Sequence, residues 1–128
     1  MHVEVRNLED VILVDMDGRL VAGVGDQILR EIMDELIAEG WQKILLNLSG
    51  VSWIDSSGIG ELVAGIRLAK RFNCSVKLLR AGDRVKHVLS LSQLLPLLEI
   101  YETEEEALER FRAETPPPPP EETGSERQ

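Results

Sequence analysis

Two adjacent hydroxyl residues near the middle of the chain, Ser56 and Ser57, directly follow an aspartate, Asp55, and precede Gly58. An apolar run that begins at Ile44 ends just before this group, and a helix-like spacing of apolar residues begins just after it. The hydroxyls are therefore expected at a turn from a strand into a helix, where the helix N-terminus favours negative charge. A turn of this kind can carry a phosphorylatable switch.

Catalysis by either serine would require a base beside it. The chain has only two histidines: His2 at the N-terminal end, and His87 next to Lys86 in a short predicted helix, where we expect a surface side chain. The G-x-S-x-G pattern of a hydrolase elbow is absent, because Ile54 stands two residues before Ser56, where that pattern has glycine. We therefore predict a protein that is not an enzyme, with no catalytic residue.

On residue chemistry alone, Asp55, Ser56 and Ser57 are also typical turn and cap residues, since these types satisfy the free amides at a helix start. Two glycines point to a further role. Gly58 and Gly60 fall in the first helical turn, where each weakens helix propensity by ~1 kcal/mol relative to alanine. Glycines in such places allow close approach by a packed neighbour or by a partner's backbone.

A glycine-rich segment, residues 23–26, precedes the first predicted helix, and its backbone amides could cradle a phosphate. The phosphate-binding pattern G-x-x-x-x-G-K-[ST] is absent. So is G-x-G-x-x-G, because Ile28 stands at its last glycine position. We interpret the segment as an entry to the helix, with a nucleotide- or small-ligand sensor as the alternative. Asp15 and Asp17 lack metal-loop spacing and are expected to be solvated edge groups, so we predict no metal and no cofactor.

Composition narrows the classes of partner. The net charge of −9 and the lack of a lysine or arginine cluster argue against nucleic acid binding. The single Cys74 cannot form an internal disulfide and is expected to be a small core or surface thiol in a reduced compartment. No signal peptide is evident, and no apolar run approaches the ~20 residues that span a bilayer. We predict a cytoplasmic protein without membrane insertion.

Hydrophobic spacing predicts one α/β domain over residues 1–114, with a mixed sheet of four to five strands and about four helices in the order ββαβαβαβα. We expect the first two strands to pair through a turn at residues 7–10, rather than to turn at Asp17-Gly18. Parallel strands should be joined by right-handed crossovers. The predicted strands are 2–6, 10–16, 44–48, 76–79 and 98–101, and the predicted helices are 26–39, 59–72, 83–91 and 103–111.

The start of the last predicted helix and the residues that follow that helix each have a characteristic sequence pattern. Thr103 and Glu106 stand three apart, as a capping box requires. From residue 115 the composition changes to five consecutive prolines followed by EETGSERQ, which has too little apolar surface to fold. We predict a disordered, proline-rich acidic tail over residues 115–128, with a docking peptide for a proline-binding module as the alternative.

The segment NLSGVSWIDSSGIGEL, residues 47–62, resembles the signature of STAS domains, and specifically of the anti-sigma factor antagonists. In that family an apolar strand ends in a hydrophobic residue and is followed by Asp-Ser-Ser/Thr/Ala-Gly-hydrophobic-Gly. The resemblance extends over residues ~1–113, because the order of strands and helices matches as well. It implies a STAS-like single domain.

The resemblance also implies a mechanism. A family member binds a serine kinase that doubles as an anti-sigma factor, and thereby frees a sigma factor. The kinase phosphorylates the hydroxyl directly after the aspartate, which matches Ser56, and a phosphatase restores the active form. By resemblance, Asp55 positions or polarises the site, Ser57 caps the helix, and the two glycines keep the surface low for the kinase. The implied partner-binding residues at this turn are Asp55, Ser56, Ser57, Gly58, Ile59 and Gly60.

One segment departs from the family pattern. Antagonists usually carry Gly-Glu-Leu-Asp after the second strand, in a region that contributes to the kinase interface. Here residues 18–21 read GRLV, so that Arg19 and Val21 stand where the family has acidic residues. We include both in the predicted partner surface. The alternative functions are a STAS subunit of a signalling scaffold or transport complex and a ligand-sensing module, and a weak homodimer is left open.

Overall fold

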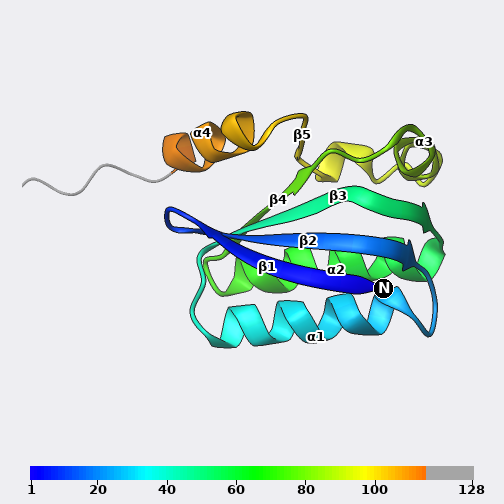
Figure 1. The fold of residues 1–128 in the computed structure, drawn as a ribbon, viewed down its shortest axis with the longest axis horizontal. Helices are drawn as coiled ribbons and strands as arrows, with labels where there is room; N and C mark the ends of the chain where they lie inside the picture. Colours follow the sequence, from blue (N-terminus) through cyan, green and yellow to red (C-terminus); the bar gives the residue numbers. More distant parts are fainter. Residues whose placement is uncertain (115–128) are drawn as a thin grey trace, which may run out of the picture.

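The computed structural model describes residues 1–114, and the predicted tail over 115–128 lies outside the described residues. The order of strands and helices is the predicted one, with an additional short 3-10 helix (Figure 1). The elements are β1 (His2–Leu8), β2 (Val11–Leu20), α1 (Gly25–Ala38), β3 (Lys43–Ile54), α2 (Ser56–Arg71), β4 (Ser75–Leu79), α3 (Asp83–Leu91), the 3-10 helix η1 (Leu95–Leu97), β5 (Ile100–Tyr101) and α4 (Glu104–Glu114).

The five strands form one mixed sheet in the order β1-β2-β3-β4-β5. β1 pairs antiparallel with β2, and the remaining neighbours are parallel. The first two strands join between Leu8 and Val11, which face each other across the pair. Asp17 lies opposite His2 within the ladder. The turn at residues 7–10 is therefore confirmed, and the alternative turn at Asp17-Gly18 does not form.

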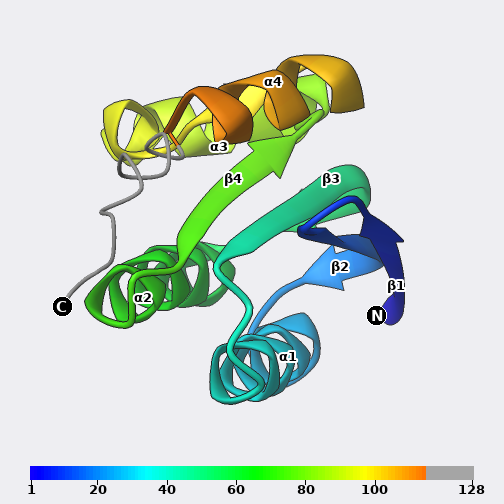
Figure 2. The ribbon, with the colours of Figure 1, turned by 90° about the vertical axis from the view of Figure 1, so that its left-hand side faces the viewer.

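Helices cover both faces of the sheet (Figure 2). On β2, Ile12 and Val14 pack in the larger core cluster with residues of α1 and α2. Val11 and Leu13 point to the opposite face, where they pack with Ala107 of α4. Because both faces are buried, the apolar residues of β2 run continuously instead of alternating with polar ones.

β3 is longer than predicted. Its expected end was residue 48, but the strand continues to Ile54. The register against β2 shifts within this second half. Val51 and Ile54 are buried three residues apart, and this spacing breaks the period of two that identifies a strand. A side chain at Gly50 would come within 2.7 Å of the Met16 carbonyl oxygen, so the irregular stretch requires glycine there.

The face under α4 contains a fully buried cation, Lys77. Its Nζ donates to carboxylate oxygens of Glu99 at 2.7 Å and of Glu114 at 2.5 Å. The same nitrogen lies 5.0 Å from the ring centroid of Phe111. At the other end of α4, the predicted capping box forms in part: the hydroxyl of Thr103 accepts the Glu106 amide at 3.1 Å, but the Glu106 carboxylate accepts the amide of Glu102 instead of that of Thr103.

Candidate functional site

The predicted turn lies at the carboxyl ends of β2 and β3, where Asp55 links three backbone segments. One of its carboxylate oxygens accepts the Gly58 amide at 2.9 Å, and the other accepts the Ala22 amide at 3.1 Å. Its own amide donates to the carbonyl of Leu20 at 3.3 Å. Asp55 therefore ties the end of β2 and the following loop to the first turn of α2, which is a positioning role.

The structure corrects the predicted cap. Asp55 has an extended backbone, with φ −111° and ψ −174°, and it is the residue that caps α2. Ser57 is already the second residue of the helix, so it cannot serve as the cap that the family resemblance implied. The helix accordingly begins at Ser56, three residues before the predicted start at residue 59.

Electrostatics at the cap favour a charged carboxylate. The backbone amides of Gly58 and then of Ala22 lower the pKa of Asp55 below its ordinary value, because they donate hydrogen bonds to the anionic form. Asp55 is therefore an anion at neutral pH, beside a helix N-terminus that favours it.

Ser56 is the exposed hydroxyl of the turn. It is the first residue of α2, whereas Ser57 is partly buried. Among residues 1–114, no group forms a hydrogen bond with the Ser56 hydroxyl. A neighbouring molecule can therefore reach this oxygen without breaking an internal contact.

The two glycines of the first turn have different reasons to be glycine. A Cβ at Gly58 would collide with the Leu20 carbonyl oxygen and would come within 2.9 Å of Cγ1 of Ile54. Gly58 is therefore needed for α2 to pack on the end of β2, and its implied role of keeping the surface low is not what requires it. Gly60 is exposed, and nothing lies within 4 Å of a Cβ built there, so a partner can approach over it.

The remaining predicted partner residues differ in how exposed they are. Arg19 is exposed near the end of β2, and its Cα pairs with that of Trp53 on β3. Trp53 is 38% exposed. Val21 is partly buried, and its carbonyl accepts the amides of Val24 and Asp26 at 3.2 and 3.3 Å. Ile59, placed on this surface by the resemblance, is instead buried in the core.

The glycine-rich loop before α1 already holds a carboxylate. One oxygen of Asp26 accepts the amides of Gly23 at 2.9 Å and of Gln27 at 2.8 Å. An anionic ligand would have to displace this internal acceptor, so the loop geometry does not favour a nucleotide site. No group of three or more His, Cys, Asp or Glu within residues 1–114 is arranged to hold a metal ion.

Two other predictions are refined by the structure. Asp15 was expected to be a solvated edge group, but its carboxylate accepts hydrogen bonds from the Arg6 guanidinium at 2.7 Å and from the side-chain amide of Asn47 at 2.7 Å. It therefore belongs to a network that joins β1, β2 and β3. Cys74 is a buried thiol whose pKa burial raises to about 11, so it stays protonated at neutral pH.

Sequence reasoning missed one residue of this edge. The Arg84 guanidinium lies over the Trp53 ring, with Cζ 5.7 Å from the ring centroid. Arg84 is in α3, far from Trp53 in the sequence, and no local pattern connects them. Only the crossover that follows β4 brings α3 to this edge.

Comparison with known proteins identifies the family of the domain. The model of the STAS domain family matches residues 2–107. A Thermotoga neapolitana protein named as a candidate anti-sigma factor antagonist is 32% identical over 105 residues, which cover 82% of this chain and 93% of that protein. A crystal structure of a candidate anti-sigma factor antagonist from Thermotoga maritima superposes with a TM-score of 0.79 at 28% identity, covering 86% of this chain and 94% of that one.

A more distant structure shares the fold. The anti-sigma factor antagonist SpoIIAA in its unphosphorylated form matches with a TM-score of 0.71 at 24% identity, covering 90% of this chain and 100% of that one. The same protein has also been solved in a phosphorylated form. Within residues 1–114 of the present chain, no helix combines the length and the apolar character needed to cross a membrane.

Proposed function

The chain belongs to the STAS domain family, and from this premise we propose that it acts as an anti-sigma factor antagonist controlled by phosphorylation of Ser56. In this proposal the unmodified chain binds a serine kinase that is also an anti-sigma factor, and thereby regulates transcription by partner switching. Phosphorylation releases the kinase, and a phosphatase returns the chain to its binding form. The chain itself is a cytoplasmic binding protein with no catalytic role.

The observation that carries the proposal is the state of the Ser56 hydroxyl. It is exposed on the first turn of α2, it has no hydrogen bond within residues 1–114, and the Asp55 cap beside it fixes the backbone. Gly60 leaves open space one helical turn further on. Phosphorylation requires that a kinase active site reach the acceptor hydroxyl, and these features leave the Ser56 hydroxyl accessible.

The charge of a phosphate explains how one modification can release a partner. Phosphorylation adds a charge of about −1.5 to −2. The N-terminus of α2 tolerates this charge, so the domain need not refold. A partner pocket shaped for a neutral hydroxyl does not tolerate it, and a penalty of ~2–5 kcal/mol weakens binding by roughly 30- to several-thousand-fold.

The test is phosphorylation by the cognate kinase. The purified chain is incubated with that kinase and ATP, and the modified residue is located by tandem mass spectrometry. We expect one phosphate on Ser56, none on Ser56→Ala, and undiminished modification of Ser57→Ala, the control at the adjacent hydroxyl. Ser56→Asp should bind the kinase more weakly than the wild type. A phosphate located on Ser57, or a wild type that stays unmodified, would contradict the proposal.

A further inference from the structure

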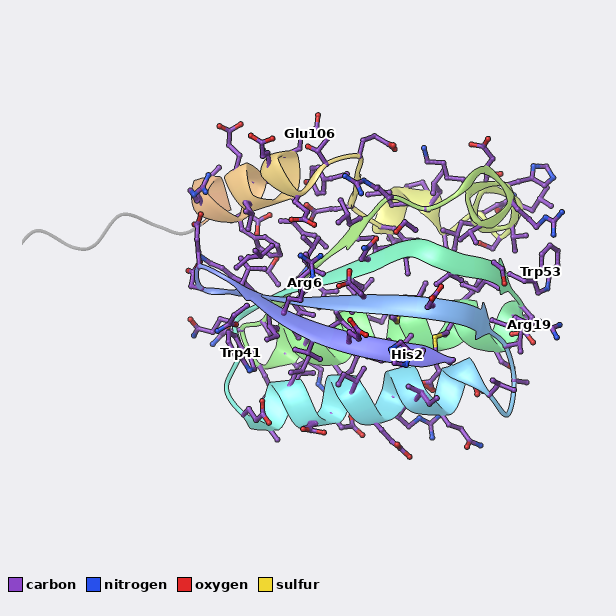
Figure 3. All side chains as sticks on the ribbon, in the orientation of Figure 1. His2, Arg6, Arg19, Trp41, Trp53 and Glu106 are labelled. Atoms are coloured by element: carbon purple, nitrogen blue, oxygen red, sulfur yellow. The ribbon has the colours of Figure 1, made fainter. Side chains whose placement is uncertain are left out.

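Arg19, Trp53 and Arg84 form a cationic aromatic patch at the carboxyl ends of β2 and β3. The Arg19 and Trp53 Cα atoms are register partners on neighbouring strands, and the Arg84 guanidinium lies over the indole ring. Figure 3 shows Arg19 and Trp53 at the same end of the molecule. Trp53 is also only three residues from Ser56, so the patch and the hydroxyl occupy one edge of the sheet.

We propose that this patch docks an acidic segment of the protein partner, in which carboxylates flank an apolar side chain. The inference rests on the proposed function in so far as it names the chemistry of the partner that Ser56 controls. The apolar side chain would pack on the exposed part of the indole, and the carboxylates would pair with the guanidinium groups of Arg19 and Arg84.

Neither of these two arginines has a carboxylate partner within residues 1–114. Three exposed arginines are ion-paired, Arg6 with Asp15, Arg30 with Glu61 and Arg112 with Glu9. Arg67, Arg71 and Arg110 are exposed and without an ion pair within residues 1–114, so what distinguishes Arg19 and Arg84 is their position beside Trp53.

Four aspartates lie near this edge, but none of them is ion-paired with Arg19 or Arg84. The carboxylates of Asp55 and Asp26 are bound to backbone amides. Asp17 and Asp83 are close in sequence to the two arginines, but neither reaches ion-pair distance of them. What sets Arg19 and Arg84 apart is that both lie beside Trp53, which is 38% exposed, without an ion pair within residues 1–114.

Three helix N-termini meet this edge, and each has one aspartate beside it: Asp26 in α1, Asp55 at the cap of α2 and Asp83 in α3. β2, β3 and β4 are parallel, and each is followed directly by a helix: α1, α2 and α3. All three helices therefore begin at the carboxyl edge of the sheet, with their partly positive ends there. Arginine and tryptophan are also the side chains that most often dominate binding energy at protein interfaces.

This arrangement connects the patch to the switch. An acidic segment bound beside Ser56 would lie close to a phosphate on that residue, and like charges so placed repel. Phosphorylation would therefore weaken two contacts: the fit of the Ser56 hydroxyl in the partner's pocket, and the binding of the acidic segment to the arginines. The identity of the arginines would select the partner, and the state of Ser56 would decide whether it stays.

A peptide titration tests the patch without a kinase. ¹⁵N-labelled chain is titrated at low salt with a synthetic peptide that alternates glutamate and leucine, and with a matched peptide that has lysine in place of glutamate. The Trp53 indole signal, assigned with Trp53→Phe, is the reporter. We expect the acidic peptide to shift this signal and the lysine peptide to leave it in place.

Variants decide whether the arginines are responsible. The Arg19→Glu/Arg84→Glu double variant should weaken acidic-peptide binding at least about tenfold, while Arg67→Glu, at an exposed arginine that also has no ion pair, should not change it. Ser56→Asp should weaken it too. An unmoved Trp53 signal, equal binding of both peptides, or an unaffected double variant would overturn the inference. If Ser56 is never phosphorylated but the patch binds, only the proposed function fails.

Discussion

Two regions of the molecule differ in whether their positively charged side chains are buried and ion-paired. Under α4, Lys77 is fully buried, and its Nζ is bound by Glu99 and Glu114 and lies over an aromatic ring. At the carboxyl edge of the sheet, Arg19 and Arg84 have no carboxylate within residues 1–114. Lys77, paired and buried, joins α4 to the sheet, whereas Arg19 and Arg84 lie unpaired at an exposed edge and form the docking surface that we propose.

The largest effect is expected at the buried cation. Lys77→Ala removes the ion pairs and the packing of the alkyl chain, so we expect the free energy of unfolding to fall by about 3 kcal/mol. Urea denaturation measures this loss. Lys77→Met, which keeps most of the volume, should lose less.

Phosphorylation of Ser56 should be unchanged in both variants at a temperature where they remain folded. If Lys77→Ala were as stable as the wild type, the buried cluster would not hold α4 in place. If it stayed folded but lost phosphorylation, the two regions would not be independent.

The next effect separates the two glycines of the switch. Gly58→Ala forces a methyl group against the Leu20 carbonyl and should lower stability by about 2 kcal/mol. Gly60→Ala places the same methyl group in open space and should raise stability by about 1 kcal/mol, because it improves helix propensity. Thermal unfolding of both variants tests this difference in sign. Equal effects would mean that Gly58 is not a packing position.

A smaller effect is expected from the charge of the helix cap. The folded-state pKa of Asp55 is lowered, so its anionic form stabilises the fold above the unfolded pKa of about 3.9, and this contribution is lost as pH falls through the folded value. Asp55→Asn keeps an acceptor for the Gly58 amide but cannot titrate. Its stability should therefore fall less steeply than that of the wild type below about pH 4.

Urea denaturation across that pH range measures the difference. Asp17→Asn, in which the carboxylate caps no helix, is the matched control and should follow the wild type. If Asp55→Asn and the wild type lost stability in parallel on acidification, the cap would not depend on its charge.

The sequence predicted the order of elements because the apolar spacing of each one is local. It placed Ser56 correctly at the junction of a strand and a helix, but it began the helix at residue 59, three residues too late. It misplaced the end of β3, because the buried Val51 and Ile54 do not follow the alternation of a strand. It also assigned the cap of α2 to Ser57, because serine and aspartate are equally suitable cap residues and only the backbone geometry decides between them. Contacts between distant segments, such as Arg84 on Trp53 or Glu114 on Lys77, left no local pattern to detect.

The most direct test of the central claim is the affinity of the chain for its kinase before and after phosphorylation of Ser56, measured by isothermal titration calorimetry without ATP turnover. The account predicts tight binding of the unmodified chain and binding at least roughly 30-fold weaker once the phosphate is present. Equal affinities for the two forms would contradict it.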